Sequence, residues 1–141
     1  MNSVIHEEYS VAQYDFANAG KASSSIKEHL KQLGVDPQVL RRIAVACYES
    51  EINLIIHAYG GDIILDVFDD GSIQLVFKDK GPGIEDIEKA MTPGFSTASE
   101  KARSMGFGAG MGLPNIKRVS DEFDIQSSSE GTTLTLRFKE S

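Results

Sequence analysis

A carboxylate and an amide stand four residues apart in a segment with a helical apolar pattern. Glu49 and Asn53 lie in "ESEIN", and apolar residues recur with helical spacing between positions 43 and 56. Residues four apart share one face of a helix. An amide oxygen suits a hard cation such as Mg²⁺, and a carboxylate can act as a general base. The pattern therefore predicts a helix whose polar face is either solvated or part of a site.

Two glycine clusters follow this segment. In "DKGPGI", Asp79 ends an expected strand, with Gly81 and Gly83 in the turn after it; in "GFGAGMGL", every second residue from 106 to 112 is glycine. An aspartate in a turn often accepts backbone hydrogen bonds. Glycine loops before a helix let backbone N–H groups approach phosphate oxygens. The second cluster matches neither a Walker A loop nor a Rossmann fingerprint, so on its own it predicts a phosphate cradle or a hinge.

Periodicity and turn residues predict elements that could position these groups. Asp15 and Asp36 are the expected N-caps of the first two helices. The order β-α-α-β-β-loop-α-β-β predicts an α+β sandwich with one mainly antiparallel sheet and helices on one face, in a single domain spanning 1–141. We expect strands at 3–11, 62–68, 72–79, 122–129 and 132–138, and helices at 15–33, 37–59, 85–91 and 113–121.

Composition narrows the classes of partner. The chain has 141 residues, a formal net charge of −7 and a pI near 4.9, which disfavours nucleic acid as a ligand. Its longest apolar runs are far shorter than the roughly 20 residues of a membrane span. The N-terminus does not read as a secretion signal, so we expect a cytoplasmic protein. The single cysteine, Cys47, is expected to be a small buried hydrophobic residue.

Taken in order, "ESEIN", "DKGPGI" and "GFGAGMGL" resemble the N, G1 and G2 boxes of the GHKL superfamily of ATPases and kinases. The longer segments "DKGPGIEDIEKAMTPGFST" and "GFGAGMGLPNIKRVSDEFDIQSSSEGT" are similar to small bacterial serine kinases of the RsbT type, and more distantly to RsbW-type anti-sigma factors. The resemblance covers essentially the entire chain. It implies a Bergerat two-layer sandwich, with a mixed, mainly antiparallel sheet and a mobile ATP lid at about 87–112.

The resemblance also implies roles for individual residues. Asp79 would accept a hydrogen bond from the adenine amino group, Gly83 would keep the turn open for the ring, and Thr132 would reach adenine through water. Asn53 would bind Mg²⁺, and Glu49 would be the general base. The remaining expected nucleotide contacts, several of them backbone amides around the triphosphate, are Gly81, Gly108, Ala109, Gly110, Met111, Gly112 and Leu113.

One segment of the expected lid departs from the RsbT pattern. Between "GFST" and "GFGAG" the chain carries "ASEKARSM", which makes the lid longer and closer to that of the anti-sigma type. Lys101 and Arg103 lie in this segment. They are either contacts to the γ-phosphate in a closed lid or solvated charges of a surface loop.

The resemblance predicts an ATP- and Mg²⁺-dependent serine/threonine protein kinase. Its substrate would be a STAS-domain protein, an anti-anti-sigma factor or a stressosome-like scaffold, in a partner-switching pathway. A sigma factor, a phosphatase and a second copy of the chain are further candidate partners. The alternative is an anti-sigma factor or nucleotide-switched activator that works by sequestration; a detached histidine-kinase catalytic domain is a third possibility.

Overall fold

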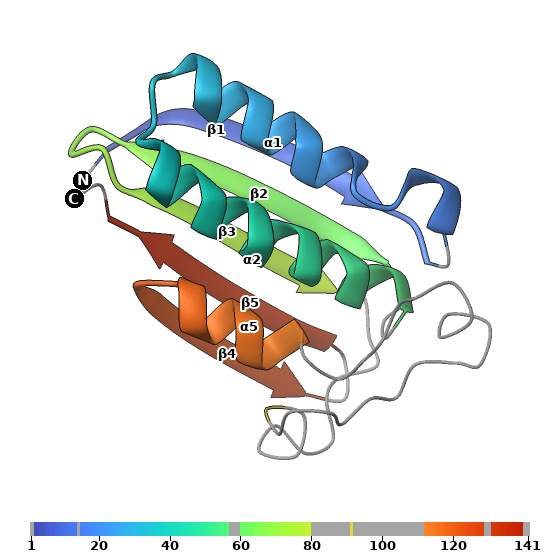
Figure 1. Cartoon of the computed structure of the whole chain (residues 1–141). Coiled ribbons are helices and arrows are strands. Elements are labelled where there is room, and N and C mark those ends of the chain that lie inside the picture. The colour runs from blue at the N-terminus through green and yellow to red at the C-terminus, as the bar shows by residue number, and fades with distance from the viewer. Residues whose placement is uncertain are drawn as a thin grey trace.

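In the part of the chain that the structure describes, five strands form one sheet, and three α-helices lie on one of its faces (Figure 1). The computed structural model describes residues 2–13, 15–56, 60–79, 91, 112–128 and 131–139. The described strands lie in the order β1-β2-β3-β5-β4, and all four pairings between them are antiparallel. The elements are β1 (Ser3–Val11), a 3₁₀ turn (Phe16–Asn18), α1 (Lys21–Gln32), α2 (Pro37–Ile56), β2 (Gly61–Phe68), β3 (Ile73–Asp79), α5 (Gly112–Val119), β4 (Glu122–Ser128) and β5 (Gly131–Phe138).

The predicted α+β fold class is confirmed, and the five predicted strands appear within one residue of the expected bounds. The helix predicted at 85–91 lies outside the described residues except for Met91, which lies in a turn. No helix in the described part of the chain has the length and apolar character needed to cross a membrane.

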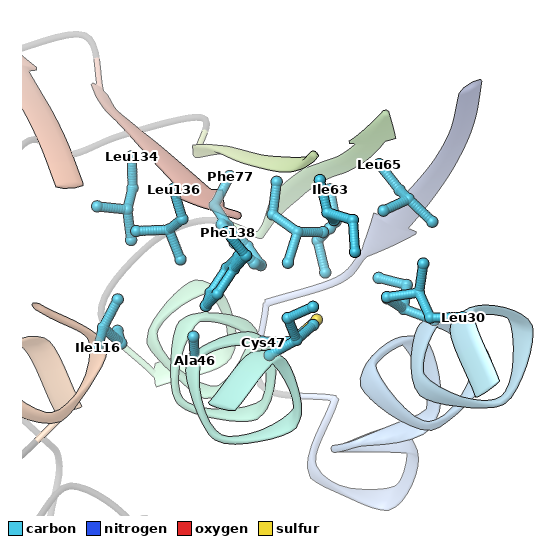
Figure 2. Packing of buried hydrophobic residues seen from close by; sticks show 14 of the residues in the cluster. Leu30, Ala46, Cys47, Ile63, Leu65, Phe77, Ile116, Leu134, Leu136 and Phe138 are labelled. Atoms are coloured by element: carbon cyan, nitrogen blue, oxygen red, sulfur yellow. The ribbon is translucent and has the colours of Figure 1, made fainter. Parts of the chain in front are cut away.

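The core lies between the sheet and the helices. Side chains alternate along the central strands, so Ile63 and Leu65 of β2 are fully buried on the helix-facing side. Figure 2 shows these residues opposite Cys47 of α2 and Leu30 of α1. Cys47 is buried as predicted, and burial raises the pKa of its thiol to about 12. The thiol is therefore protonated at neutral pH.

The first helix starts later than predicted. Asp15 does not cap it; its carboxylate instead accepts hydrogen bonds from the Asn18 side-chain amide at 2.8 and 3.0 Å. Gly20, with φ +91°, is the N-cap residue, and α1 begins at Lys21. The cap comes from α2: the Glu51 carboxylate accepts hydrogen bonds from the backbone N–H of Gly20 (3.0 Å) and of Ser23 (2.9 Å). A tertiary contact thus satisfies the donors that a local side chain was expected to satisfy.

Two glycines control how the chain passes from α2 into β2. Gly60 has φ +80°, a backbone conformation that favours glycine, and its N–H donates to the Leu54 carbonyl at 3.2 Å. A Cβ atom on Gly61 would lie 2.1 Å from the Lys78 carbonyl oxygen and 2.9 Å from Asp79 Cα. No side chain fits there without a shift of the backbone. Glycine at position 61 therefore allows β2 to approach the end of β3 closely.

Candidate functional site

Two predicted site residues from distant parts of the chain are in direct contact. Asp79 ends β3 and Thr132 is the second residue of β5, its neighbour in the sheet. The Thr132 backbone N–H donates to Asp79 Oδ1 at 2.7 Å. This bond fixes the carboxylate at the sheet end where the chain also enters β2, because Gly61 pairs with Asp79.

The Thr132 side chain is buried beside β4. It is 7% exposed, and its hydroxyl lies 2.8 Å from the Ser127 hydroxyl. A hydroxyl has one donor hydrogen and two acceptor lone pairs, so this contact leaves capacity for a water molecule. The indirect adenine contact predicted for Thr132 is compatible with this geometry and stays a prediction.

Glu49 and Asn53 lie on the flank of α2 that faces α5. Arg42, two turns before Glu49 on the same flank, donates to the Val119 carbonyl at 3.1 Å and to Asp121 Oδ1 at 3.3 Å. These contacts place Arg42 beside the C-terminal end of α5. The two helices run in opposite directions in Figure 1. At about 1.5 Å per residue, Glu49 lies roughly 10 Å further along α2, level with the first turn of α5.

The environment of Glu49 suits a base. Its side chain is partly buried, and this burial raises the pKa of the carboxyl above its usual value. No hydrogen bond or ion pair engages its carboxylate in the part of the chain that the structure describes. A carboxylate that is desolvated and lacks a protein partner has an increased affinity for a proton.

The metal ligand predicted at Asn53 stands four residues after Glu49 and is partly buried. Its side-chain oxygen is a hard donor of the kind that Mg²⁺ accepts. Among the described residues there is no group of three or more His, Cys, Asp or Glu side chains that could hold a metal ion. A cation here would therefore need most of its ligands from a bound nucleotide and water, as is usual for Mg²⁺ with phosphates.

The first turn of α5 completes this end of the molecule. The first residues of a helix have backbone N–H groups without intrahelical partners, and these favour anions. Gly112 and Leu113 begin α5, but the Leu113 side chain is buried in the core. Leu113 could therefore contact a nucleotide through its backbone only. In Figure 1 the start of α5, the end of α2, the end of β3 and the start of β5 all lie at one end of the molecule.

The other predicted contacts lie outside the described residues: Gly81, Gly83, Lys101, Arg103, Gly108, Ala109, Gly110 and Met111. The structure thus shows direct contact between Asp79 and Thr132, and it places the end of α2 and the start of α5 at the same end of the molecule. The lid and both glycine turns stay predictions.

Two charged residues with clear structural roles were not singled out from the sequence. Arg42 joins α2 to the end of α5, and Glu51 caps α1 from inside the protein. The sequence does contain a pattern that indicates a buried role for Glu51. The helix neighbours of Glu51 at spacings of three and four include Cys47, Leu54 and Ile55, which are buried, so a carboxylate on this face needs buried donors.

Comparison with known proteins agrees with this arrangement. A family model described as a histidine kinase-like ATPase domain matches residues 13–138. The chain belongs to this family. The predicted resemblance is therefore confirmed.

Two curated relatives of this histidine kinase-like ATPase domain carry different names. The chain is 39% identical over 108 residues to the serine/threonine-protein kinase RsbT of Bacillus subtilis (strain 168), covering 74% of this chain and 75% of that protein. It is 32% identical over 143 aligned positions to the anti-sigma F factor of Geobacillus sp. (strain WCH70), covering 97% of this chain and 92% of that protein.

A solved structure shares the fold. The structure of the RsbU and RsbW domains of Rv1364c from Mycobacterium tuberculosis matches with a TM-score of 0.65 at 18% identity. The match covers 95% of this chain and 32% of that one, so the present chain spans about a third of that protein.

Proposed function

We propose that this histidine kinase-like ATPase domain is an ATP- and Mg²⁺-dependent serine/threonine protein kinase whose substrate is a STAS-type partner protein. The observation that carries the proposal is the position of Glu49. Its carboxylate has a raised pKa, lacks a partner among the described residues, and lies level with the start of α5. The name of the relative RsbT supports the same reaction.

In this proposal Asp79 selects the nucleobase of the bound nucleotide. Its carboxylate is held by the Thr132 backbone N–H, and a carboxylate oxygen can accept more than one hydrogen bond. It would accept a second one from the adenine amino group. A guanine carbonyl at the same place would meet the carboxylate with no hydrogen to donate, so Asp79 favours adenine.

Asn53 would hold Mg²⁺ through its amide oxygen. When bound, the cation would neutralise part of the negative charge of the phosphates. The backbone N–H groups at the start of α5 would add a fixed positive potential toward the same anion. Catalysis in this class of reaction depends mostly on such positioning and charge neutralisation.

Glu49 would act on the partner's hydroxyl group. It would take the hydroxyl proton as that oxygen forms its bond to the γ-phosphorus, while the bond from the γ-phosphorus to the β,γ-bridging oxygen breaks. The products are a phosphoserine or phosphothreonine on the partner, ADP, and the proton on Glu49. A raised pKa suits this role because it makes the carboxylate a stronger base.

A second function is sequestration of a sigma factor, with nucleotide controlling which partner is held. The observation that favours it is the name of the anti-sigma F factor relative, which matches nearly the whole chain. This function needs nucleotide binding but does not need Glu49 to accept a proton.

Transfer of labelled phosphate separates the two functions. The protein is incubated with γ-labelled ATP, Mg²⁺ and a purified STAS-domain protein encoded by the same genome. The kinase proposal predicts acid-stable phosphate on serine or threonine of the partner, with the rate reduced about 10²- to 10⁴-fold in Glu49→Gln. Binding of a sigma factor without any transfer would favour sequestration, and acid-labile phosphate on the partner would indicate a histidine kinase instead.

A further inference from the structure

A groove of about 650 Å³ runs between α1 and α2, on the other side of α2 from the candidate nucleotide site. Ala44 and Tyr48 line it from α2. They stand one turn apart, and Glu51, two turns after Ala44 on the same flank, contacts the start of α1. Glu49 lies on the flank that faces α5. The groove and the candidate nucleotide site therefore belong to different faces of one helix.

The groove is lined by hydrogen-bond donors and carries positive charge. Among the described residues, its lining contains two lysines, Lys21 and Lys27, and no acidic residue, in a chain with a net charge of −7. Neither ammonium group has an ion pair in the described structure, and both side chains are exposed. The described residues that line the groove are Ala19, Gly20, Lys21, Ser23, Ser24, Ser25, Lys27, Ala44 and Tyr48.

Apolar surface lies beside these charges. Tyr48 is a large side chain that is nevertheless 40% exposed, and Ala44 and Ala19 flank the same space. An aromatic ring with a hydroxyl at its tip is typical of residues that anchor protein interfaces. This combination of surfaces suits a peptide that has both acidic and apolar side chains.

The start of α1 is not itself the anion site. Glu51 is 2% exposed and already accepts hydrogen bonds from the N–H groups of Gly20 and Ser23, and from the Ser23 hydroxyl at 2.5 Å. Its carboxylate balances the positive end of the helix dipole from below. The positive charge of the groove therefore comes from the two lysines, which can reach outward to a ligand.

We propose that the groove between α1 and α2 docks an acidic segment of a partner protein, with Lys21 and Lys27 pairing with its carboxylates and Tyr48 packing on an apolar side chain. Nucleic acid is a poorer occupant, because two lysines on an acidic chain make a weak phosphate-binding surface. A second copy bound symmetrically would place two lysine-bearing linings without described acidic residues against each other, because a two-fold contact uses the same patch on both copies.

Chemical-shift mapping by NMR tests the proposal directly. The labelled protein is titrated with a short synthetic peptide that alternates Asp or Glu with Leu, and with the same peptide in which Asn and Gln replace the acids. We expect only the acidic peptide to shift the amide resonances of residues 19–27, 44 and 48. The double variant Lys21→Glu/Lys27→Glu should bind it at least about tenfold more weakly.

A matched variant controls for total charge. Lys31→Glu/Lys139→Glu changes the net charge equally at exposed sites outside the groove, and it should keep most of the affinity. The ATP affinity, measured by titration of the same samples, should be unchanged in both double variants. A failure of the proposed nucleotide site is therefore detected separately from a failure of the docking proposal.

Four results would overturn the docking proposal. They are no shift in the groove at saturating acidic peptide, equal binding of the neutral peptide, stronger shifts of the same resonances with a short DNA strand, or concentration-dependent self-association through this groove.

Discussion

At the scale of single residues, the site depends on how each polar group is paired. Asp79 is oriented by the backbone N–H of Thr132, whereas Glu49 has no such partner among the described residues and is partly desolvated. The Asp79 carboxylate is thus oriented as a hydrogen-bond acceptor, and the Glu49 carboxylate is able to take a proton. This difference in environment gives the two groups different roles in the proposed reaction.

The raised pKa of Glu49 predicts the pH dependence of phosphate transfer. The base must be ionised to act, so the rate should fall as pH decreases through the folded-state pKa of Glu49. Because burial raises this pKa, the decline should begin at a higher pH than an ordinary glutamate, with a pKa of about 4.3, would give. Single-turnover rates between pH 5 and 8 measure it. An acid limb that persists with the same midpoint in the residual activity of Glu49→Gln would contradict the assignment.

The raised pKa of Glu49 also predicts how its charge affects the stability of the fold. A folded pKa above the unfolded one means that the ionised carboxylate opposes folding, and this cost is complete above the folded pKa. Glu49→Gln removes the charge and keeps the shape, so at pH 7 the variant should be as stable as the parent protein or more stable. Urea unfolding at pH 7 checks this. A clear loss of stability would indicate that Glu49 has a structural role instead.

At the scale of elements, α2 contacts three neighbours: α5, the sheet and α1. One side of α2 packs on the sheet through Ala46 and Cys47 (Figure 2). One flank contacts α5 through Arg42, and the remaining flank contacts α1 through Glu51. The orientation of α2 therefore determines where Glu49 and the groove lie.

Removal of the Glu51 cap should destabilise the α1–α2 contact. Glu51→Ala leaves the N–H groups of Gly20 and Ser23 without their buried acceptor. We expect a loss of about 2 kcal/mol in the free energy of unfolding. Glu28→Ala, an exposed glutamate on α1, is the control and should change stability by less than about 0.5 kcal/mol. Equal effects of the two substitutions would show that the cap contributes little.

The Gly61 contact predicts a link between strand packing and nucleotide affinity. Gly61→Ala would force the new Cβ against the Lys78 carbonyl and Asp79 Cα. The resulting shift should cost about 1–3 kcal/mol of stability and weaken ATP binding through the displaced Asp79. Gly34→Ala is the control, because Gly34 has a positive φ, +83°, and open space around its Cβ position, so alanine there strains the backbone without pressing on β3. It should lower stability without changing the ATP affinity, and an equal change in affinity in both variants would exclude the positioning role.

At the scale of the whole molecule, the sequence predicted the order and bounds of most elements because the periodicity of apolar residues is a local property. The start of α1 was predicted wrongly for the opposite reason: its cap, Glu51, lies 28 or more residues away in sequence and approaches only when the helices pack. The contact between Asp79 and Thr132 likewise depends on the pairing of β3 with β5. The resemblance to the GHKL superfamily implied that both residues lie near adenine, but it did not predict their direct contact.

The central claim is that distant segments join at one end of the sheet to bind a magnesium nucleotide, and isothermal titration calorimetry of the protein with ATP or ADP in excess Mg²⁺ tests it most directly. Asp79→Asn keeps an oxygen for the Thr132 N–H but presents an amide hydrogen to the adenine amino group. We predict clear binding by the parent protein and an affinity at least about tenfold lower in Asp79→Asn, with circular dichroism unchanged. No heat of binding in the parent protein, or equal affinity in the folded variant, would contradict the claim.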